Sequence, residues 1–556
     1  MKRISSLTIP AVLAALVGSE GCAPDLSCEG DWCGTLVMVS PAEPPTLLPI
    51  FAQFDIHIAL AAQLFWRLAD VGPNPTSRGH ESFVPGLAEQ WEFSDDSLTV
   101  VFRLNPAARW HDGAPVTARD VAFTFDVYRD TIINALPRSR LDRIVSVTER
   151  DPATVAFQFS ERYPEQFFDA VYHMRILPHH LLDTIPRAGL RNHPVARNPV
   201  GNGPFRLRRW DAGEAIELLA DSTFFAGRPS VRRLLWQFSS DVPTMVTQLA
   251  AGEVDVLYPV TGLENIDRIR GEPDLRTVDV QSNAYAYVAF NFRDPADLDR
   301  PHPLFADRRL RRALTMAVDR AVIVRSVMGD AGVVPVGPVT AGHWIWDDDI
   351  EQLPYDPDRA RTLLSELGWS DSDADGVLDR DGQPLSFELL ISSTSVLRVR
   401  SAVFLQEQLK QAGIDMTIQT LEPNAWGSRV FGSRRFDSYF GSWLQDPSPG
   451  SVTESWTAAG IDAGNVGGYT NSEIDRLVQS ARSEFDPAVA KEMWKAVIGL
   501  INGDAPAIWI YGGVVTVGIH DRFENVSFPW DEWWKNLWMF RVAASRLIDR
   551  DLMPAY

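Results

Sequence analysis

The segment that most constrains the fold is 85–125, PGLAEQWEFSDDSLTVVFRLNPAARWHDGAPVTARDVAFTF. Residues 98–104 are β-branched and aromatic, which predicts a strand, and the Asp95-Asp96-Ser97 cluster before them is typical of a turn. Apolar residues in 116–125 follow helical spacing, with Thr117 as the start signal. The W-H-D-G stretch between strand and helix predicts a tight turn. This order predicts a compact structural module and contains no catalytic motif.

The length of the chain predicts more than one lobe. A chain of 556 residues exceeds the roughly 250 to 300 residues at which a single core stops growing. Strands expected over 385–391 and 416–421 flank a helix expected over 399–412, and this alternation is typical of an α/β lobe. The basic stretch 304–318 predicts an amphipathic helix whose arginines are solvated or capping charges.

Composition limits the partners. Apolar residues make up 45% and charged residues 22%, as in ordinary soluble globular proteins. The net charge of −21, without a block of Lys or Arg, excludes nucleic acid as a partner and indicates an acidic, solvated surface. Eighteen tryptophans indicate either an aromatic-lined cavity or large cores, and the composition leaves both open.

The N-terminus has the layout of a secretion signal. Lys2-Arg3 precede an apolar stretch over 7–18 that is too short to span a bilayer, and no later run of 18 apolar residues exists. Ser19-Glu20-Gly21-Cys22 resembles a bacterial lipoprotein cleavage box, although Ser19 and Glu20 depart from it. We therefore expect Cys22 to carry lipid, with cleavage nearby and a free soluble protein as the alternative.

All three cysteines lie before residue 34. If Cys22 is lipidated, Cys28 and Cys33 remain as a pair in an oxidising compartment, which predicts a short disulfide. A metal site is the rival, but the C-x4-C spacing has no histidine or second cysteine pair near it.

Several stretches together carry a family resemblance. They are the P-x-L-A-E-x-W, S-D-D, W-H-D-G and T-A-x-D-V-x-F-T patterns of 85–125, the Gly-rich turn 198–205 with Asn202 in place of threonine, the stretch QLAAGEVD at 248–255, and 305–320. In this order they closely resemble the extracytoplasmic solute-binding proteins of ABC transporters, in the family 5 group that binds oligopeptides, dipeptides or nickel. The resemblance covers essentially the whole chain after residue 34.

The resemblance implies an α/β, bilobal, periplasmic-binding-protein-like fold with three domains, of the large class II or cluster C type. It implies a monomer, held at the membrane only by its lipid, that closes on a peptide or other small solute and delivers it to ABC transporter permease subunits. No chemistry and no enzyme activity are expected, and the location is periplasmic or at the cell surface. The expected segments are a signal peptide (1–21), a tether (22–34), domain I (35–70, 198–285 and 505–556), domain II (71–197) and domain III (286–504).

The resemblance also implies binding residues. Ser442 to Asp446 resembles a G-W-x-x-D stretch whose acidic residue holds the α-ammonium of a peptide, which makes Asp446 the expected anchor and Trp443 an expected wall. Asp446 as a turn residue before Pro447 is the alternative. Dipeptide-binding relatives place an arginine for the peptide carboxylate where this chain has Ser392, and Arg398 is the candidate nearby. This departure favours longer peptides or a different ligand.

An acidic loop follows at 371–382 and begins like a calcium loop. Asp371, Asp373, Asp375 and Asp379 occupy positions 1, 3, 5 and 9, with Gly376 at position 6. The glutamate of position 12 is missing. We expect an ordinary turn or a weak Ca²⁺ site, and no other cofactor.

Other functions stay open at this stage. Within the family, the tryptophans suit an oligosaccharide, and the neighbouring His179 and His180 are poorly placed to share a metal. A carbohydrate-active enzyme would use paired carboxylates, which Glu89, Asp112 and Asp531-Glu532 supply without a recognisable motif. A ligand sensor for a signalling receptor would have the same sequence features.

Overall fold

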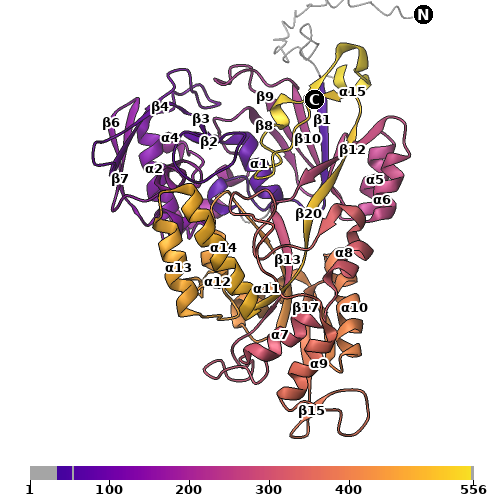
Figure 1. The fold of residues 1–556 in the computed structure, drawn as a ribbon. Coiled ribbons are helices and arrows are strands. Elements are labelled where there is room, and N and C mark those ends of the chain that lie inside the picture. Colours follow the sequence, from indigo (N-terminus) through magenta and orange to yellow (C-terminus); the bar gives the residue numbers. More distant parts are fainter. Residues whose placement is uncertain (1–33, 53–54, 462, 553–556) are drawn as a thin grey trace, which may run out of the picture.

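The computed structural model describes residues 34–52, 55–461 and 463–552 (Figure 1). Its largest element is a mixed sheet of twelve strands with helices on its faces, so the α/β prediction is confirmed. Within the described ranges, no helix combines the length and apolarity that crossing a bilayer requires. The strands of the sheet are β1 (Thr35–Ser40), β8 (Phe205–Asp211), β9 (Ala215–Ala220), β10 (Arg233–Phe238), β11 (Val256–Val260), β12 (Leu275–Gln281), β13 (Ala284–Phe290), β14 (Gly332–Val333), β17 (Ser386–Ser392), β18 (Asp415–Leu421), β19 (Ser438–Leu444) and β20 (Ala507–His520).

One long strand, β20, connects the two lobes (Figure 1). Its first residues pair with β13, next to β19, β17 and β18 of the C-terminal lobe. Its last residues pair with β11 and β12 of the N-terminal lobe, where β1, β10, β9 and β8 follow. Between these halves lies Gly513, with φ +119° and Ala331 O only 2.5 Å from where a Cβ would stand. The strand expected over 507–512 is therefore longer and belongs to both lobes.

Residues 71–197 form an inserted segment with its own four-stranded sheet. The sheet order is β4 (Ala88–Phe93), β5 (Thr99–Leu104), β7 (Thr154–Phe159) and β6 (Ile144–Asp151), and helix α2 (Ala118–Arg129) packs against it. Strand β5 and helix α2 lie where the sequence predicts them. Thr117 caps α2, and its backbone N–H donates to Asp120 Oδ2 at 2.8 Å. The local signals therefore predicted β5 and the start of α2, whereas β4 was not predicted and α2 continues four residues past the expected end at 125.

The Gly-rich turn 198–205 determines where helix α1 (Asp55–Leu64) ends. The backbone N–H groups of Asn202 and Gly203 both donate to Leu64 O at 2.9 Å, and Trp66 N–H donates to Asn202 Oδ1 at 2.7 Å. A Cβ at Gly201 would lie 1.9 Å from Leu64 O. The helix expected over 59–68 stops four residues early, because N–H groups of the turn bond to the carbonyl of Leu64 that a longer helix would use itself.

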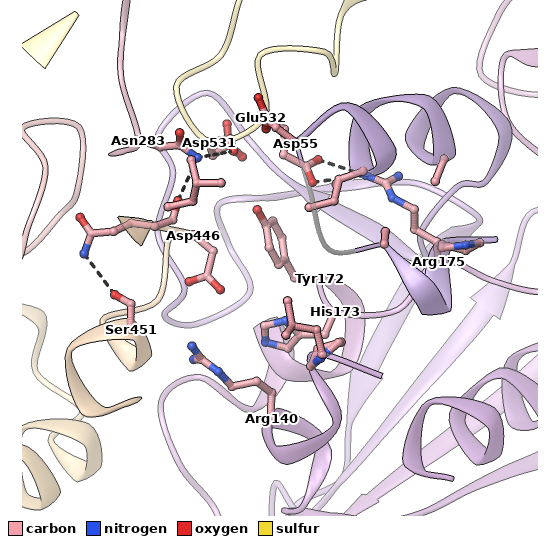
Figure 2. A pocket seen from close by; sticks show the side chains of 18 of the residues that line it. Asp55, Arg140, Tyr172, His173, Arg175, Asn283, Asp446, Ser451, Asp531 and Glu532 are labelled. Carbon is pink, nitrogen blue, oxygen red and sulfur yellow. Dashed lines mark hydrogen bonds and ion pairs between the residues drawn. The ribbon is translucent and has the colours of Figure 1, made fainter. Parts of the chain in front are cut away.

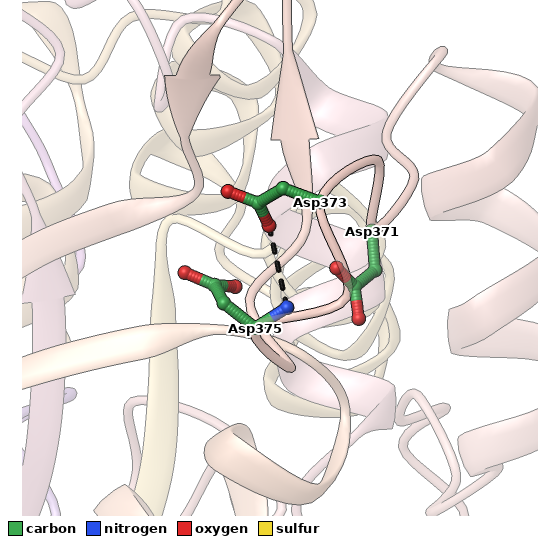
Figure 3. A group of neighbouring side chains, drawn as sticks. All are labelled: Asp371, Asp373 and Asp375. Carbon is green, nitrogen blue, oxygen red and sulfur yellow. Dashed lines mark hydrogen bonds between the residues drawn. The ribbon is translucent and has the colours of Figure 1, made fainter.

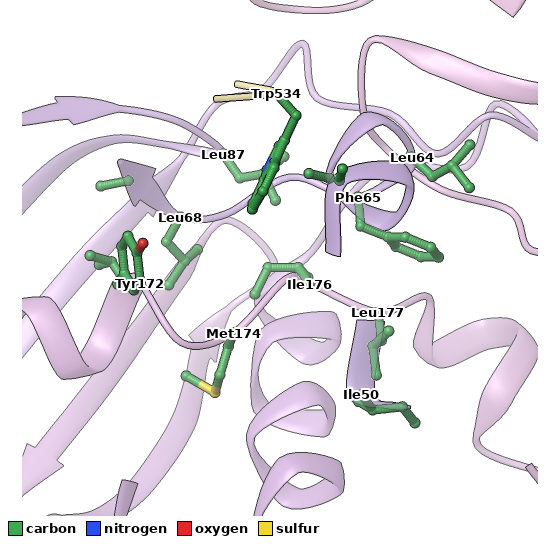
Figure 4. Close-up of a cluster of buried hydrophobic side chains, with 14 of the residues drawn as sticks. Ile50, Leu64, Phe65, Leu68, Leu87, Tyr172, Met174, Ile176, Leu177 and Trp534 are labelled. Atoms are coloured by element: carbon green, nitrogen blue, oxygen red, sulfur yellow. The ribbon is translucent and has the colours of Figure 1, made fainter. Parts of the chain in front are cut away.

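The inserted segment shares one hydrophobic core with the rest of the N-terminal lobe (Figure 4). Leu64 and Phe65 of the opening segment lie in this core with Leu177 of the insertion and Trp534 of the C-terminal segment. Chain segments more than 450 residues apart thus pack together. This core makes the insertion and the remainder of the lobe one packed body.

Two cores flank β13 in the C-terminal lobe. Alternate residues of the strand, such as Phe290 and Tyr287, enter different cores, as the period of a strand requires. One face carries α7 (Arg308–Met316), α9 (Pro357–Glu366) and α10 (Val396–Gln411). The other carries α12 (Gly450–Trp456), α13 (Ser472–Ser483) and α14 (Pro487–Asp504). Figure 1 shows α13 and α14 lying next to the inserted segment.

Of the two roles expected for the arginines of 304–318, solvated or capping charges, Arg311 has the second. Its side chain is 3% exposed and donates to Phe305 O at 2.7 Å and Asp504 O at 2.8 Å. These acceptors include the last carbonyl of α14, which has no partner inside its own helix. Arg311 therefore joins α7 to the end of α14, a contact between distant segments that local spacing does not reveal.

Candidate functional site

A cavity of about 300 Å³ lies between the lobes (Figure 2). Both lobes and the inserted segment contribute side chains to it. The N-terminal lobe supplies Asp55 and Arg67, and the inserted segment supplies Arg140, Tyr172, His173 and Arg175. The C-terminal lobe supplies Trp443, Gln445, Asp446, Ser451 and Glu454, and the last segment returns with Asp531, Glu532 and Trp534. The lining is strongly charged.

Glu532 is the best compensated charge of the cavity. It is 3% exposed and accepts two bonds of 2.8 Å from the guanidinium of Arg67. Arg175 donates to the same carboxylate at 3.2 and 3.3 Å. Burial alone would lower the pKa of Arg67, but Glu532 and Asp70 raise it above its ordinary value. The geometry makes Glu532 a structural anchor, with no free oxygen for a ligand.

Asp446 is different, because it makes no ion pair within 4 Å with another described residue. Its Oδ1 accepts the backbone N–H of Ser448 at 2.8 Å, in a turn that includes Pro447. Burial raises the pKa of Asp446, against the opposing influence of Arg140 and His173. One oxygen therefore forms the expected turn, and the residue also lines the cavity, whereas its role as the ammonium anchor stays a prediction.

Arg140 crosses from the inserted segment to the C-terminal lobe. Its Nε donates to Glu454 Oε1 at 2.6 Å, and Nη1 lies 3.4 Å from Ser448 Oγ. Ser448 Oγ also donates to Glu165 Oε2 at 3.1 Å, a second polar contact between the same lobes. The cavity is therefore closed on one side by direct contacts. Arg140 pairs with Glu454, so it is not bonded to Asp446.

Asp531 and Asp55 are the other two cavity-lining carboxylates that have no ion-pair partner among the described residues. Trp533 Nε1 donates to Asp55 Oδ2 at 3.0 Å, whereas Asp531 Oδ2 is buried with no hydrogen-bond partner. Burial raises the pKa of each to about 6, and the neighbouring Glu532 adds to both shifts. The desolvated carboxylates favour a positively charged group beside them.

The structure brings together only part of the expected site. Asp446 and Trp443 both line the cavity, whereas Arg398 is not among its described lining residues. Arg398 lies in the first turn of α10, where burial lowers its pKa and Tyr511 and Tyr287 oppose that effect. Sequence reasoning did not identify Asp55, Arg67, Arg140 or Arg175 as site residues. No local motif surrounds them, because they converge only through the fold.

The tryptophans mostly serve cores. Trp443 and Trp534 line the cavity, whereas Trp110, Trp236 and Trp494 are among the largest fully buried side chains. Trp534 Nε1 is buried and has no hydrogen-bond partner in the described part of the chain. The abundance of tryptophan is therefore explained mainly by the large cores.

The acidic loop lies at the surface, away from the cavity (Figure 3). Carboxylate oxygens of Asp371, Asp373 and Asp375 lie within 4.8 Å of one another, and all three residues are exposed. Each also accepts a backbone N–H of the loop, from Gly376, Asp375 and Val377 respectively. The fourth expected ligand, Asp379, accepts instead from the hydroxyl of Ser372 at 2.6 Å. Ca²⁺ binding at this turn stays a prediction.

The remaining expected ligand sets are separate in the structure. His180 pairs with Asp112 at 2.8 Å and His179 with Asp183 at 3.3 Å, so the two histidines turn to different partners. Glu89 lies 3.5 Å from Arg103 on the inserted sheet. The expected lipid on Cys22 and the expected disulfide between Cys28 and Cys33 fall in 1–33, outside the described residues.

Comparison with protein families gives a match over most of the chain. The model of the bacterial extracellular solute-binding proteins, family 5, matches residues 82–464. The oligopeptide-binding protein AppA of Bacillus subtilis (strain 168) is 29% identical over 484 residues, which cover 86% of each chain. The dipeptide-binding protein of Escherichia coli (strain K12) is 24% identical over 534 residues, or 89% of this chain and 94% of the relative.

Solved structures have the same fold. The oligopeptide-binding protein AppA from Bacillus subtilis, solved in complex with a nonapeptide, superposes with a TM-score of 0.80 at 26% identity. It covers 92% of this chain and 99% of its own. NikZ from Campylobacter jejuni, in complex with Ni(L-His), gives a TM-score of 0.79 over 91% of this chain. At 22% identity, the second likeness concerns the fold alone.

Proposed function

Because the chain belongs to family 5 of the bacterial extracellular solute-binding proteins, and so binds a solute rather than catalysing a reaction, we propose that it captures a peptide by its N-terminal ammonium. The ammonium would bind Asp446 in the cavity between the lobes. Delivery to the permease subunits of an ABC transporter follows from this role. Attachment to the membrane through lipid on Cys22 belongs to the same proposal.

The observation that carries the proposal is the state of Asp446. Its carboxylate is desolvated at the cavity and has no cation bonded to it, although Arg140 is close enough to lower its pKa. An ammonium group supplies both the charge and the donors that this carboxylate lacks. The similarity to an oligopeptide-binding protein and to a dipeptide-binding protein supports a peptide as the carrier of that ammonium.

The size of the cavity bears on the length of the peptide. A volume of about 300 Å³ is at the small end of the range for ligand pockets. It suits a short peptide or the N-terminal end of a longer one, whose remainder would need the lobes to separate further. The absence of Arg398 from the described lining residues supports an anchor at the ammonium end, with no arginine for the carboxylate taken from α10.

Calorimetric titration tests the proposal. Wild type and Asp446→Asn are titrated with trialanine and with N-acetyl-trialanine, because the variant preserves shape and the acetyl group removes the ligand charge. Removing one member of a buried charged pair costs on the order of 3 kcal/mol, more than a hundredfold in affinity. We expect either change to cause that loss, and the two changes combined to add little.

The control is Asp373→Asn, which makes the same charge change on the exposed loop. It should bind trialanine like the wild type. If Asp446→Asn binds trialanine as tightly as the wild type does, or if acetylation has no effect, the ammonium anchor is wrong. An oligosaccharide, stacked on Trp443 or Trp534, then becomes the leading ligand.

A further inference from the structure

Building on the proposed peptide function, we propose that Asp531 and Asp55 form a second cation subsite, which selects peptides whose first residue is lysine or arginine. The ammonium of that residue would bind Asp446, and its basic side chain would bind the pair across the cavity. The subsite would therefore determine which peptides bind most tightly.

The charges of the cavity leave these carboxylates available. Three arginines line it, and all three are bonded to glutamates: Arg67 and Arg175 to Glu532, and Arg140 to Glu454. Five carboxylates line it. The three aspartates, Asp55, Asp446 and Asp531, therefore face the cavity without a bonded cation among the described residues. The carboxylates outnumber the arginines by two, so a ligand with one positive charge would leave one negative charge unbalanced.

Asp531 gives the strongest single indication of a ligand group. The residue is 5% exposed and lines the cavity, and its Oδ2 has no hydrogen-bond partner among the described residues. A buried acceptor without a partner costs free energy, more so when it is charged. Lys535, the nearest basic side chain in the sequence, binds Asp70 at 3.1 Å and Val71 O at 2.6 Å instead. Asp531 Oδ2 is therefore open to a donor from the ligand.

The backbone segments that carry Asp446 and Asp531 come from different lobes and are joined by Asn283. Asn283 Nδ2 donates to Gln445 O at 3.1 Å and to Asp531 O at 3.3 Å, so a single amide joins the two backbones (Figure 2). Asp446 follows Gln445 directly. This bridge holds together the two backbone segments that present Asp446 and Asp531 to the cavity.

A single metal ion does not fit this arrangement. Groups of three acidic or histidine side chains with ligand atoms within 4.8 Å occur, among the described residues, only at Asp371, Asp373 and Asp375. The three cavity aspartates thus do not bring three ligand atoms within 4.8 Å of one another. Separated carboxylates match separated positive groups, as in a lysine residue with a free N-terminus.

The test compares Lys-Ala-Ala with norleucine-Ala-Ala by calorimetry at pH 7.5, since norleucine has nearly the shape of lysine without its charge. We expect wild type to bind the lysine peptide at least tenfold more tightly. Asp531→Asn should reduce this preference below threefold while its affinity for the norleucine peptide stays unchanged. Asp55→Asn should act in the same direction and guards against a folding defect in the first variant. Asp373→Asn, with the same charge change outside the cavity, should keep the full preference.

The outcomes separate this proposal from the function on which it rests. Equal binding of both peptides to the wild type overturns the second subsite and leaves peptide capture intact. A lysine preference that survives in both Asp531→Asn and Asp55→Asn places the cation elsewhere and also overturns the assignment. If neither peptide binds the wild type, peptide capture itself fails.

Discussion

Two carboxylates of one cavity, the buried Glu532 and the half-buried Asp446, have opposite surroundings. Glu532 binds two guanidinium groups from different segments of the N-terminal lobe. Asp446 has one backbone donor and no bonded cation. Both are desolvated, so the difference lies in what compensates them. The first charge is balanced by folding, whereas we propose that the ammonium of a bound peptide balances the second.

Because of this contrast, we expect Glu532 to contribute to stability and Asp446 to contribute to binding. Breaking a buried ion pair by removing one partner leaves the other charge uncompensated, which is strongly destabilising. Removing a buried charge that has no partner eliminates an unfavourable desolvation instead. Substitutions of the two carboxylates should therefore affect different measurements, and this is how the comparison is tested.

The largest expected effect is on folding. Glu532→Gln leaves Arg67 and Arg175 close together without their shared carboxylate, so the free energy of unfolding should fall by about 3 to 5 kcal/mol. Urea denaturation without ligand measures it. Asp446→Asn is the matched control and should change the same quantity by less than about 1 kcal/mol. A Glu532→Gln protein as stable as the control would remove the distinction between the two carboxylates.

The second effect depends on pH. The pKa of Asp531 is about 6 in the folded protein, against roughly 3.9 for an unfolded aspartate, so the folded state binds more protons between these values. Its contribution to stability is fully present below about pH 4 and is lost as pH rises through 6. Asp531→Asn removes this loss. Its unfolding free energy, relative to the wild type, should therefore rise by up to about 2 to 3 kcal/mol from pH 4 to pH 7.

Denaturation series at several pH values would measure this slope. Asp373→Asn, an exposed carboxylate, should run parallel to the wild type over the same range. A flat difference between Asp531→Asn and wild type would show that Asp531 is compensated after all, by Lys535 or by another charge of the cavity.

The smallest expected effect comes from a substitution that would give Asp446 an arginine partner, as Glu532 already has. Glu454→Gln releases Arg140, which can then pair with Asp446 and compete with the ligand's ammonium. Trialanine should bind about tenfold more weakly, equivalent to about 1.4 kcal/mol. Adding Arg140→Gln removes the competitor and should restore affinity to within about threefold of wild type. Unchanged binding in Glu454→Gln would mean that Arg140 does not control the availability of Asp446.

Local signals predicted the elements of the fold well, because caps, turns and periodicity act over a few residues. Helix α2 begins where Thr117 indicates, and β5 lies within its expected strand. The predictions fail where contacts with distant segments determine the end of a helix or the burial of a side chain. Helix α1 stops at Leu64 because a turn more than 130 residues later binds its last carbonyl, and Arg311 is buried because α14 ends beside it.

The site was less predictable for the same physical reason. Asp446 and Trp443 were identified because they lie together in one recognisable stretch. Asp55, Arg140 and Asp531 come from segments almost 480 residues apart, and each looks like an ordinary surface charge in the sequence. Arg398 was proposed from its position before an expected helix at 399, but α10 begins at Val396, which places Arg398 within its first turn.

Strand β20 limits how relatives of this protein can be recombined. A fragment of residues 286–504 would lose the strand that pairs with most of β13, leaving a long unprotected sheet edge prone to aggregation. Chimeras that exchange ligand preference between relatives should therefore transfer the C-terminal lobe together with 507–513, and rejoin the chain after Gly513, where the backbone already turns. Because of this strand, the C-terminal lobe can be exchanged only together with a segment that lies more than 200 residues after its first strand, β13.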